Sequence, residues 1–353
     1  MEWANVINQF AIEGEVLSAE LFGNGHIHQT FKVSTSDKPY LLQEINEEVF
    51  ADVPSLMQNI QAVSEHLKGT KGNALELVLT KQGQPYYEGQ AGLWRVFHFV
   101  GNSKSYDQPT DGSLAELAGE GFGEFISQLA DLPLAAVSET IPDFHDICWR
   151  FRQWDETKGN ASSQKLEECV DEIGFVESQR KKMEAYFKGL HENTLPLRVI
   201  HNDTKLNNIL FVGEQQMPCV VDLDTVMPGY VAFDFGDAIR TIANRAEEDE
   251  KDLAKVQFEK VFFERFAKGF AAKTISVFTK KEVESLAFAP AYMTFIMGLR
   301  FLTDYLGGNK YYSIKHEKHN LVRAKCQFAF AQVLHQNISY ITNYIQSMYQ
   351  GNT

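Results

Sequence analysis

The first hundred residues alternate between hydrophobic and polar positions as strands do. Five segments follow this pattern and end at turn-forming residues: 15–22, 27–34, 39–46, 75–80 and 93–100. One helix interrupts them at 53–67, where apolar residues recur every three or four positions and Pro54 stands near the start. The order β-β-β-α-β-β predicts a small β-rich N-terminal lobe.

The rest of the chain is mostly helical by the same criterion, and a polar, turn-rich segment at 101–113 separates the two patterns. Helices are expected at 114–131, 145–157, 163–191 with a break near Gly174, 236–245, 250–271, 280–305 and 317–347. One β-rich island, 197–223, interrupts these helices. We therefore expect an α+β protein with two lobes, a β-rich lobe over 1–100 and a larger, mostly helical lobe over 101–353.

Composition and charge are those of an ordinary globular protein. The chain has 353 residues, which is more than a single hydrophobic core usually serves, so two lobes are the natural expectation. Its 33 basic and 47 acidic residues give a net charge of −14, which argues against nucleic acid and anionic membranes as main partners. The four cysteines are widely spaced, so we expect neither a zinc cluster nor a disulfide framework.

No segment has the pattern of a signal for export or membrane insertion. The first ten residues lack the basic and apolar regions of a secretory signal, and the longest nearly apolar run, 287–299, is too short to cross a bilayer. A cytoplasmic protein, monomeric or weakly dimeric, is the expectation. The acidic run 247–252 is interpreted as the solvated start of a helix. The basic run 311–325 is interpreted as a solvated helix face, with attraction of phosphate or product as the alternative.

The β-rich island brings polar residues together. Its two short apolar strands, 209–212 and 219–221, are separated by a turn-like segment and can pair as a hairpin. If the hairpin closes, Asn208 and Asp222 meet at its open end. Asp203 lies five residues before Asn208, in the loop that leads into the first strand. The sequence therefore predicts that these three side chains gather at one place.

This set of side chains suits phosphoryl transfer. Asp203 can orient an attacking hydroxyl and accept its proton, while Asn208 and Asp222 supply the oxygen ligands that Mg²⁺ prefers. Lys205 can neutralise charge on the transferred phosphoryl group. A polar turn with capping aspartates is the structural alternative.

The same residues carry a resemblance to a known family. Residues 201–208, HNDTKLNN, resemble the H-x-D-x-x-x-x-N catalytic loop of the aminoglycoside phosphotransferase and choline kinase superfamily. Residues 221–224, VDLD, resemble the superfamily's metal-binding segment, which implies Asp222 as a metal ligand and makes Asp224 the candidate ligand of a second ion. The resemblance also implies a two-lobed protein-kinase-like fold, and His201 as structural support of the loop.

Further segments are similar to bacterial N-acetylhexosamine 1-kinases: HNDTKLNNIL, VDLDTVMPG, FDFGDAIR, GNGHIHQTF, QEIN and FLTDYLGG. This similarity runs from about residue 20 to residue 335. It implies ATP as phosphoryl donor, Mg²⁺ as cofactor and an amino sugar as acceptor. The expected reaction is phosphorylation of the anomeric hydroxyl of N-acetylglucosamine or N-acetylgalactosamine to the 1-phosphate.

Residues 234–236 spell the DFG triplet of protein kinases, which would make Asp234 the metal ligand. Asp234 lies beyond Pro228 and Gly229, outside the hairpin, so Asp222 is preferred as the ligand beside Asn208. By resemblance, Asp234 supports the catalytic loop through hydrogen bonds. A role as N-cap of the following helix is the compatible alternative.

The nucleotide side departs from the kinase pattern. Gly23 and Gly25 begin a Gly-rich loop, but His28 replaces its third glycine, so a plain hairpin turn is the alternative. By resemblance, His26 and His28 face either the nucleotide or the acceptor.

The third strand carries no lysine for the α- and β-phosphates. Gln43 stands at that place, and either it makes a neutral contact or another cation serves. Arg95 is one candidate for that cation, with a surface position on its strand as the alternative. Residues 97–100, with Phe97 and Phe99, would form the strand that pairs with adenine, by resemblance only.

The acceptor is expected in the helical part. Arg300 ends an apolar stretch, where it either pairs with a carboxylate such as Asp304 or binds the substrate, as the sugar 1-kinase resemblance favours. Phe144, Trp149 and Trp154 are candidates for a wall that stacks on a sugar, with core packing as the alternative.

Three rivals remain open. A kinase of an amino alcohol or aminoglycoside, such as choline or homoserine, shares the core motifs. A protein kinase would need APE and VAIK elements that the sequence lacks. A non-catalytic nucleotide-binding protein of kinase-like fold would have lost one of the three key residues, and all three are present.

Overall fold

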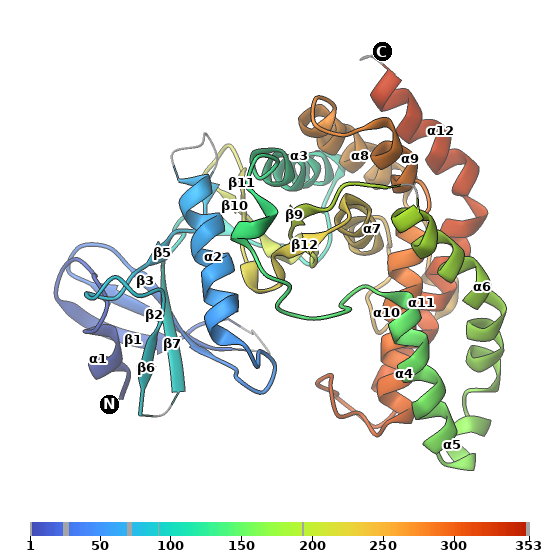
Figure 1. Cartoon of the computed structure of the whole chain (residues 1–353), viewed down its shortest axis with the longest axis horizontal. Helices are drawn as coiled ribbons and strands as arrows, with labels where there is room; N and C mark the ends of the chain where they lie inside the picture. Colours follow the sequence, from blue (N-terminus) through green and yellow to red (C-terminus); the bar gives the residue numbers. More distant parts are fainter. Residues whose placement is uncertain (1, 24–27, 69–72, 91, 193, 351–353) are drawn as a thin grey trace.

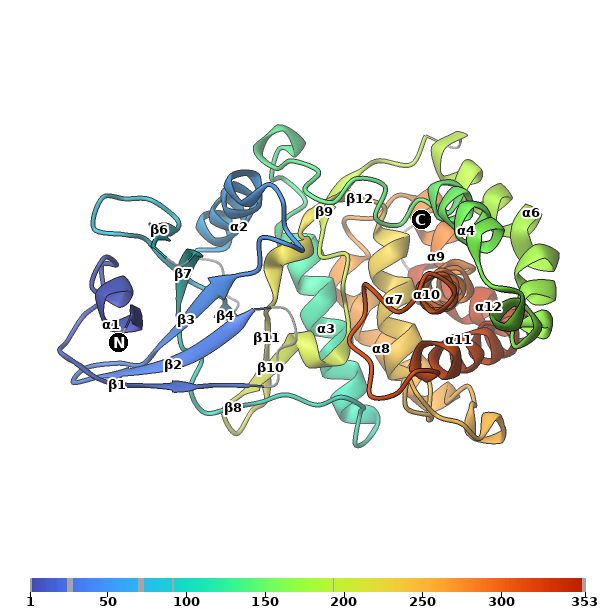
Figure 2. The same cartoon turned by 90° about the horizontal axis from the view of Figure 1, so that it is seen from below.

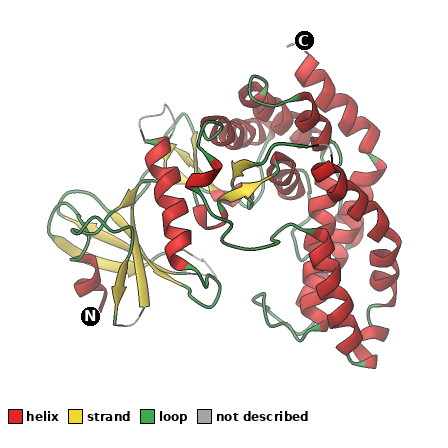
Figure 3. Ribbon diagram, viewed as in Figure 1, coloured by secondary structure: helices red, strands yellow, loops and turns green. Residues whose placement is uncertain are grey.

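The computed structural model describes residues 2–23, 28–68, 73–90, 92–192 and 194–350. Figures 1 and 2 show the large sheet with α1 and α2 at one end of the molecule and most other helices at the opposite end, with the short strands β9 to β12 between them. Figure 3 makes the same division visible by secondary structure. The predicted α+β fold with a β-rich N-terminal part and a helical C-terminal part is confirmed.

The N-terminal sheet has six antiparallel strands in the order β1-β2-β3-β7-β5, and β6 also pairs with β7. Their bounds are β1 Val16–Leu21, β2 Gln29–Thr35, β3 Tyr40–Ile45, β5 Leu77–Val78, β6 Tyr87–Gly89 and β7 Gly92–His98. All five predicted strands are present, although the fourth is shorter than expected. The helix α2, Val53–Leu67, has the predicted bounds because Asp52 caps its start and accepts from the Ser55 amide.

Two small sheets connect this part to the helices. The first has the order β4-β11-β10-β8, with bounds β4 Asn73–Ala74, β8 Ser103–Lys104, β10 Ile209–Val212 and β11 Met217–Val220. The second pairs β9, Arg198–Ile200, with β12, Met227–Gly229. Because β4 precedes residue 100 and pairs with β11, the two parts share a sheet. The domain boundary at residues 100 and 101 stays a prediction.

The helical part is built from α3 to α12. Their bounds are α3 Gly112–Gln128, α4 Ile147–Asn160, α5 Ser163–Glu167, α6 Val170–Glu192, α7 Val231–Ile242, α8 Lys260–Thr274, α9 Lys280–Leu286, α10 Ala289–Leu306, α11 His319–Gln336 and α12 Ile338–Tyr349. A short helix, α1 Glu2–Ile7, precedes the sheet and was not predicted. Among the described residues no single helix is long and apolar enough to cross a membrane, and α9 with α10 passes that test only as a pair bent by 52°.

Several predicted helices have different bounds. The segments 280–305 and 317–347 each form two helices, α9 with α10 and α11 with α12. The helix expected at 236–245 is α7, which begins at Val231, so Asp234 lies inside the helix and is not its N-cap. The segment 163–191 breaks between α5 and α6 at residues 168–169 and continues through Gly174, where a side chain would meet open space. The helix expected at 250–271 begins only at Lys260, after a short 3₁₀ turn at Leu253–Lys255.

The acidic run 247–252 is therefore not the start of a helix. Asp249 accepts hydrogen bonds from Lys315 (2.9 Å) and His319 (2.9 Å), and Glu248 pairs with Arg323 (3.6 Å). The basic run 311–325 thus supplies partners for the acidic run. Most residues of both runs are at least partly exposed, as the sequence suggested, but the two runs are joined to each other by these pairs.

Close helix packing fixes the segment around the DFG triplet. Gly236 in α7 lies against the start of α10, where an added Cβ would come within 2.4 Å of the Ala289 carbonyl oxygen. Only glycine allows this approach without a shift of backbone, so the glycine of the triplet is explained by packing. α7 in turn carries Asp234 beneath the catalytic loop.

Candidate active site

The loop 201–208 follows β9 and is held by hydrogen bonds at its first residues. Asp234 accepts from the backbone amides of His201 (2.8 Å) and Asn202 (2.7 Å), and its own carbonyl accepts from the Thr204 hydroxyl. Burial raises the pKa of Asp234 to about 6, against the opposing effect of His201 and the two amides. Both carboxylate oxygens are thus used by the loop, and Asp234 lies where a supporting residue is needed.

His201 is fully buried and ties the loop to the hairpin. Its Nε2 donates to the Val221 carbonyl (2.9 Å), which leaves Nδ1 to accept from the Asp203 amide (3.3 Å). Phe122 and Phe125 of α3 contact the ring edge to face. The ring therefore joins the amide of the predicted catalytic aspartate to the end of the hairpin.

Asp203, Lys205 and Asn208 form one connected group. Lys205 Nζ lies 2.9 Å from Asp203 Oδ2, and Asn208 Nδ2 donates to the same oxygen (3.0 Å) and to the Asp203 carbonyl (2.8 Å). Burial would raise the pKa of Asp203, but the charge and hydrogen bond of Lys205 outweigh it and lower that pKa. Since the amide nitrogen of Asn208 is used, its oxygen is the atom that can bind a metal ion.

Asp222 ends the hairpin beside this group. Ile209 pairs with Val220 and the Val221 amide donates to the Asn208 carbonyl (2.9 Å), so the open end closes within one residue of the predicted register. Asp222 has a left-handed backbone (φ 62°, ψ 62°), which is uncommon outside glycine and ends the strand direction of β11. The pairing thus places Asn208 opposite Val221, the residue before Asp222.

The charge around Asp222 fits a hard cation. Desolvation by the surrounding protein, followed by the negative charges of Asp224 and Asp203, raises the pKa of Asp222 to about 7. Asp222 is nevertheless exposed to solvent, so a ligand can reach it. A carboxylate crowded by two others and an amide oxygen are a suitable donor set for Mg²⁺.

Asp224 has partners that the sequence did not suggest. Both Nη atoms of Arg95 bind its carboxylate, one at 2.9 Å, and His28 Nε2 lies 2.8 Å from Oδ2. Gln43 Oε1 accepts from Arg95 Nε (3.0 Å), and Gln43 Nε2 donates to the Thr30 hydroxyl (3.1 Å). Asp224 is therefore an ion-pair partner in this structure, and Gln43 hydrogen-bonds to Arg95. The role of Asp224 as a second metal ligand stays a prediction.

Arg95 is buried, with an exposed fraction of 3%, so a surface position is wrong. His28 accepts from the Asn46 amide through Nδ1 (3.1 Å), which makes Nε2 the protonated nitrogen that donates to Asp224. His28 also stacks on Phe50. The predicted contact of His28 with a ligand is replaced in this structure by a contact with Asp224.

The remaining predicted nucleotide residues are described in part. Gly23 has the positive φ (79°) that favours glycine, whereas Gly25 and His26 lie outside the described residues. Phe97 in β7 is buried against Leu41 and Leu77 of the neighbouring strands. Phe99 follows β7 and packs edge to face on Phe22. Their roles in binding adenine stay predictions.

On the other side of the loop lies an arginine cluster, which we define as Arg150, Arg300, His145 and Tyr312. Arg300 lies over the rings of Phe144 (5.0 Å) and Tyr312 (5.6 Å), and among the described carboxylates none forms an ion pair with it or with Arg150. Burial, then the charge of Arg300, lowers the pKa of Arg150 to about 9. Arg150 donates to the Phe144 carbonyl (2.7 Å) and to Gln153 Oε1 (3.0 Å), and the charge of Asp143 partly offsets the lowering of its pKa. The cluster thus carries positive charge without an ion pair to a described carboxylate.

Three buried polar atoms in the arginine cluster have no partner within the described part of the chain: His145 Nδ1, Arg150 Nε and the Tyr312 hydroxyl. His145 Nε2 donates to the Asn202 carbonyl (3.0 Å), which places the cluster next to Asp203. Unpaired buried polar atoms are costly, so such a group is typical of a ligand site.

The suggested pair of Arg300 with Asp304 is wrong. Asp304 instead accepts from the backbone amides of residues 310 to 312 and from Asn320 (2.9 Å), and so shapes the loop that carries Tyr312. Trp154 is fully buried and donates to Glu177 (3.1 Å), which makes it a core residue.

Three observations identify the family. The loop, the hairpin and Asp222 are arranged as expected, the fold has the two predicted parts, and residues 18–266 match the sequence profile of the phosphotransferase enzyme family (APH). The chain belongs to the phosphotransferase enzyme family.

Solved structures similar to this phosphotransferase share its fold across nearly the whole chain. A microcompartment-associated aminopropanol kinase is 14% identical, with a TM-score of 0.63 and coverage of 95% of this chain and 96% of its own. An aminoglycoside phosphotransferase from Alicyclobacillus acidocaldarius is 14% identical, with a TM-score of 0.60 and coverage of 96% of both chains. A spectinomycin phosphotransferase in complex with ADP and spectinomycin is 12% identical, with a TM-score of 0.58 and coverage of 94% of both chains.

Sequence reasoning missed Arg150, His145 and Tyr312 in this phosphotransferase. Tyr312 lay in a run noted only for its basic charge, and Arg150 lay between two tryptophans that drew attention to stacking. The hydrophobic flanks of Arg150 in α4 are the one local signal, because an arginine among buried positions needs a partner.

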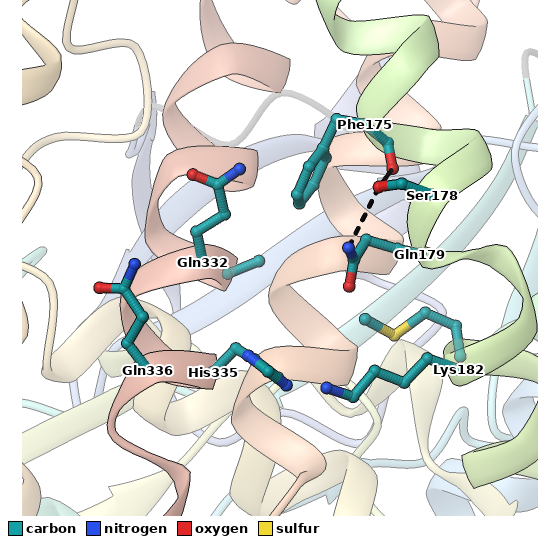
Figure 4. Close-up of a pocket in the computed structure, with 9 residues that line it drawn as sticks. Phe175, Ser178, Gln179, Lys182, Gln332, His335 and Gln336 are labelled. Atoms are coloured by element: carbon teal, nitrogen blue, oxygen red, sulfur yellow. Dashed lines mark hydrogen bonds between the residues drawn. The ribbon is translucent and has the colours of Figure 1, made fainter.

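A separate groove of about 370 Å³ lies between α6 and α11 (Figure 4). Phe175, Gln179 and Lys182 line it from α6, and Gln332 and His335 face them from α11. None of the predicted site residues lines this groove, so it is not part of the catalytic arrangement.

Proposed function

We propose that this phosphotransferase is an ATP- and Mg²⁺-dependent kinase of a small uncharged sugar, with the anomeric hydroxyl of an N-acetylhexosamine as acceptor. The arginine cluster beside Asp203 carries this proposal. Two guanidinium groups without carboxylate partners repel a cationic acceptor, whereas they donate hydrogen bonds to hydroxyl and carbonyl oxygens.

The reaction requires a base, charge neutralisation and in-line geometry. Asp203 accepts the proton of the anomeric hydroxyl as the oxygen attacks the γ-phosphorus of ATP and ADP leaves. The pKa of Asp203 is lowered, so its carboxylate is ionised at neutral pH. An anomeric hydroxyl is more acidic than an ordinary alcohol, so a weak base suffices.

Lys205 and the metal site act on the phosphates. Lys205 lies 2.9 Å from Asp203 and keeps its proton, because the carboxylates of Asp203 and Asp222 raise its pKa, and it can share that charge with the transferred group. Asn208 and Asp222 would hold Mg²⁺, which supplies charge neutralisation between the nucleotide phosphates when bound.

The main rival is a kinase of an amino alcohol or aminoglycoside. Proteins of similar fold act on such compounds by name, including aminopropanol and spectinomycin. Cationic acceptors are best held by carboxylates or aromatic cages. Here His145 contacts the loop on that side, and the two arginines beside His145 form no ion pair with a described carboxylate, which favours the uncharged sugar.

An ATP-consumption screen tests the proposal. The panel contains N-acetylglucosamine, N-acetylgalactosamine, 2-deoxyglucose, a uronic acid, choline, homoserine and an aminoglycoside. We expect turnover with the N-acetylhexosamines, and proton-coupled phosphorus NMR should place the phosphate on C1. The 1-O-methyl glycoside should be inert, because the attacking oxygen is blocked. Phosphate on C6, or turnover only with a cationic acceptor, would refute the sugar 1-kinase function.

A further inference from the structure

The third strand of the sheet lacks the lysine that kinases use, and the structure shows what stands in its place. Gln43 in β3 and Arg95 in β7 are direct cross-strand neighbours. Gln43 Oε1 accepts from Arg95 Nε (3.0 Å), which points the guanidinium across the sheet toward Asp224. The expected position thus holds a neutral amide that orients a cation from the next strand.

Arg95 is committed to a carboxylate and not open to a ligand. It binds Asp224 with both terminal nitrogens, and its exposed fraction is 3%. A guanidinium held in this bidentate way, with a third bond to Gln43, has fixed geometry. The phosphates of a nucleotide would have to break the pair to reach it.

Asp224 lies in a turn that is hydrogen-bonded to the catalytic loop, so the position of Arg95 affects that loop. It lies in the short 3₁₀ turn Leu223–Thr225, directly after Asp222. The Thr225 hydroxyl donates to the His201 carbonyl (2.7 Å), and Asn202 Nδ2 donates to the Thr225 carbonyl (3.1 Å). A path of hydrogen bonds and one chain step, from Asp224 to Thr225, therefore runs from the N-terminal sheet to the two residues that precede Asp203.

We propose that Arg95 replaces the missing lysine as a positioning residue, acting through Asp224 on the metal-binding segment rather than on the nucleotide phosphates. The inference rests on the proposed kinase function. By holding Asp224 in an ion pair, Arg95 leaves Asn208 and Asp222 as the protein ligands of a single Mg²⁺. Partners that orient metal ligands without touching the metal are a recurrent device in metal sites.

Calorimetric titration of ADP with and without Mg²⁺ tests this role without turnover. The variants are Arg95→Met, Arg95→Lys, Asp224→Asn and the double variant Arg95→Met with Asp224→Asn. Lys38→Met is the matched control, since Lys38 is on the same part of the chain and pairs with Glu13 at an exposed site. Melting temperatures establish that each variant is folded.

For Arg95→Met we expect Mg²⁺-free ADP affinity close to wild type, and a loss of roughly 10–100-fold in the affinity gained by adding Mg²⁺. Asp224→Asn should show the same loss, and the double variant should be no worse than either single one, because both act in one path. Arg95→Lys should recover part of the effect. The Lys38→Met control should match wild type.

A direct phosphate contact gives the opposite pattern. Arg95→Met would then lose Mg²⁺-free ADP affinity while Asp224→Asn kept it, and their effects would add, which overturns the proposal. If Arg95→Met does not fold, Arg95→Lys and Asp224→Asn decide by the same criterion. Wild-type protein that binds no nucleotide would instead refute the kinase function itself, and this inference with it.

Discussion

Two groups of charged side chains flank the loop 201–208. Within the described part of the chain, one contains a carboxylate without a cationic partner, and the other contains guanidiniums without a carboxylate partner. On the nucleotide side three carboxylates gather, of which Asp203 and Asp224 have cationic partners and Asp222 has a pKa raised to about 7 by burial and like charge. On the acceptor side two guanidiniums, Arg150 and Arg300, lie together with no carboxylate partner among the described residues.

The difference teaches what each side is built to receive. Buried or crowded charge without a partner is costly, so it persists where a ligand supplies the missing charge. The carboxylate side lacks a cation, which suits Mg²⁺ with a nucleotide. The arginine side lacks carboxylate ion-pair partners among the described residues, which suits a polyhydroxyl compound and disfavours an ammonium group.

Substitution of Asp203, which lies between the two groups, should have the largest effect on turnover. Asp203→Asn removes the proton acceptor, and loss of a general base typically lowers turnover by ~10²–10⁴-fold. Nucleotide affinity should stay near wild type, because Asp222 is unchanged and Asn208 Nδ2 keeps the Asp203 backbone carbonyl as acceptor. Rapid-quench measurement of turnover, with calorimetric binding of ADP as control, checks this. Turnover within threefold of wild type would contradict the role of Asp203.

Comparing Asp222→Asn with Asp234→Ala distinguishes the predicted metal ligand from the residue that supports the loop. The first should abolish the Mg²⁺-dependent part of ADP binding, because a hard oxygen ligand is lost. The second should keep Mg²⁺ dependence but lower the free energy of unfolding by about 2 kcal/mol, because two buried amides of the loop lose their acceptor. Calorimetry and denaturant unfolding measure the two effects. Loss of Mg²⁺ dependence in the Asp234 variant alone would reverse the assignment.

The acceptor side can be tested with Arg150→Gln and Arg300→Gln. Each should raise the KM for N-acetylglucosamine by roughly 10–100-fold, since hydrogen bonds from charged donors are lost, while the KM for ATP stays the same. Arg152→Gln is the matched control, because Arg152 is exposed on the same helix, α4. An unchanged acceptor KM in both variants would remove the arginine cluster from the site.

The smallest effect concerns pH and stability. Burial, then the charge of Arg300, lowers the pKa of His145 to about 3. Below about pH 6.5 the unfolded chain takes up a proton on His145 that the native protein refuses, so stability falls as pH falls, by about 2 kcal/mol at pH 5. His145→Gln should remove that part of the acid sensitivity.

Denaturant unfolding at about pH 7.5 and about pH 5 measures the His145 effect. His316→Gln serves as the control, because His316 is exposed. An acid sensitivity of the His145 variant equal to wild type would show that His145 is not buried among the arginines.

The sequence predicted the part of the site whose residues are close together along the chain. Asp203, Asn208 and Asp222 lie within twenty residues and one hairpin, so strand pairing alone brings them together. The strands of the N-terminal sheet and α2 were predictable for the same reason, because period and caps act over short distances.

Long-range pairs were not predictable in this way. Arg95 and Asp224 are 129 positions apart, and the arginine cluster joins α4 to α10 and the loop after it. Such contacts depend on tertiary packing, which no local pattern encodes. The absent helix at 250–259 has the same origin, since Asp249 takes its partners Lys315 and His319 from the far end of the chain.

Comparing N-acetylglucosamine with glucosamine tests most directly what the arginine cluster selects. The two sugars share every hydroxyl and differ at C2, where one carries an acetamide and the other an ammonium. We predict a kcat/KM for N-acetylglucosamine at least ~10²-fold higher, because an ammonium is repelled beside two guanidiniums that form no ion pair with a described carboxylate. Arg300→Gln should narrow that ratio. A glucosamine kcat/KM equal to or above that of N-acetylglucosamine would contradict the uncharged-sugar site.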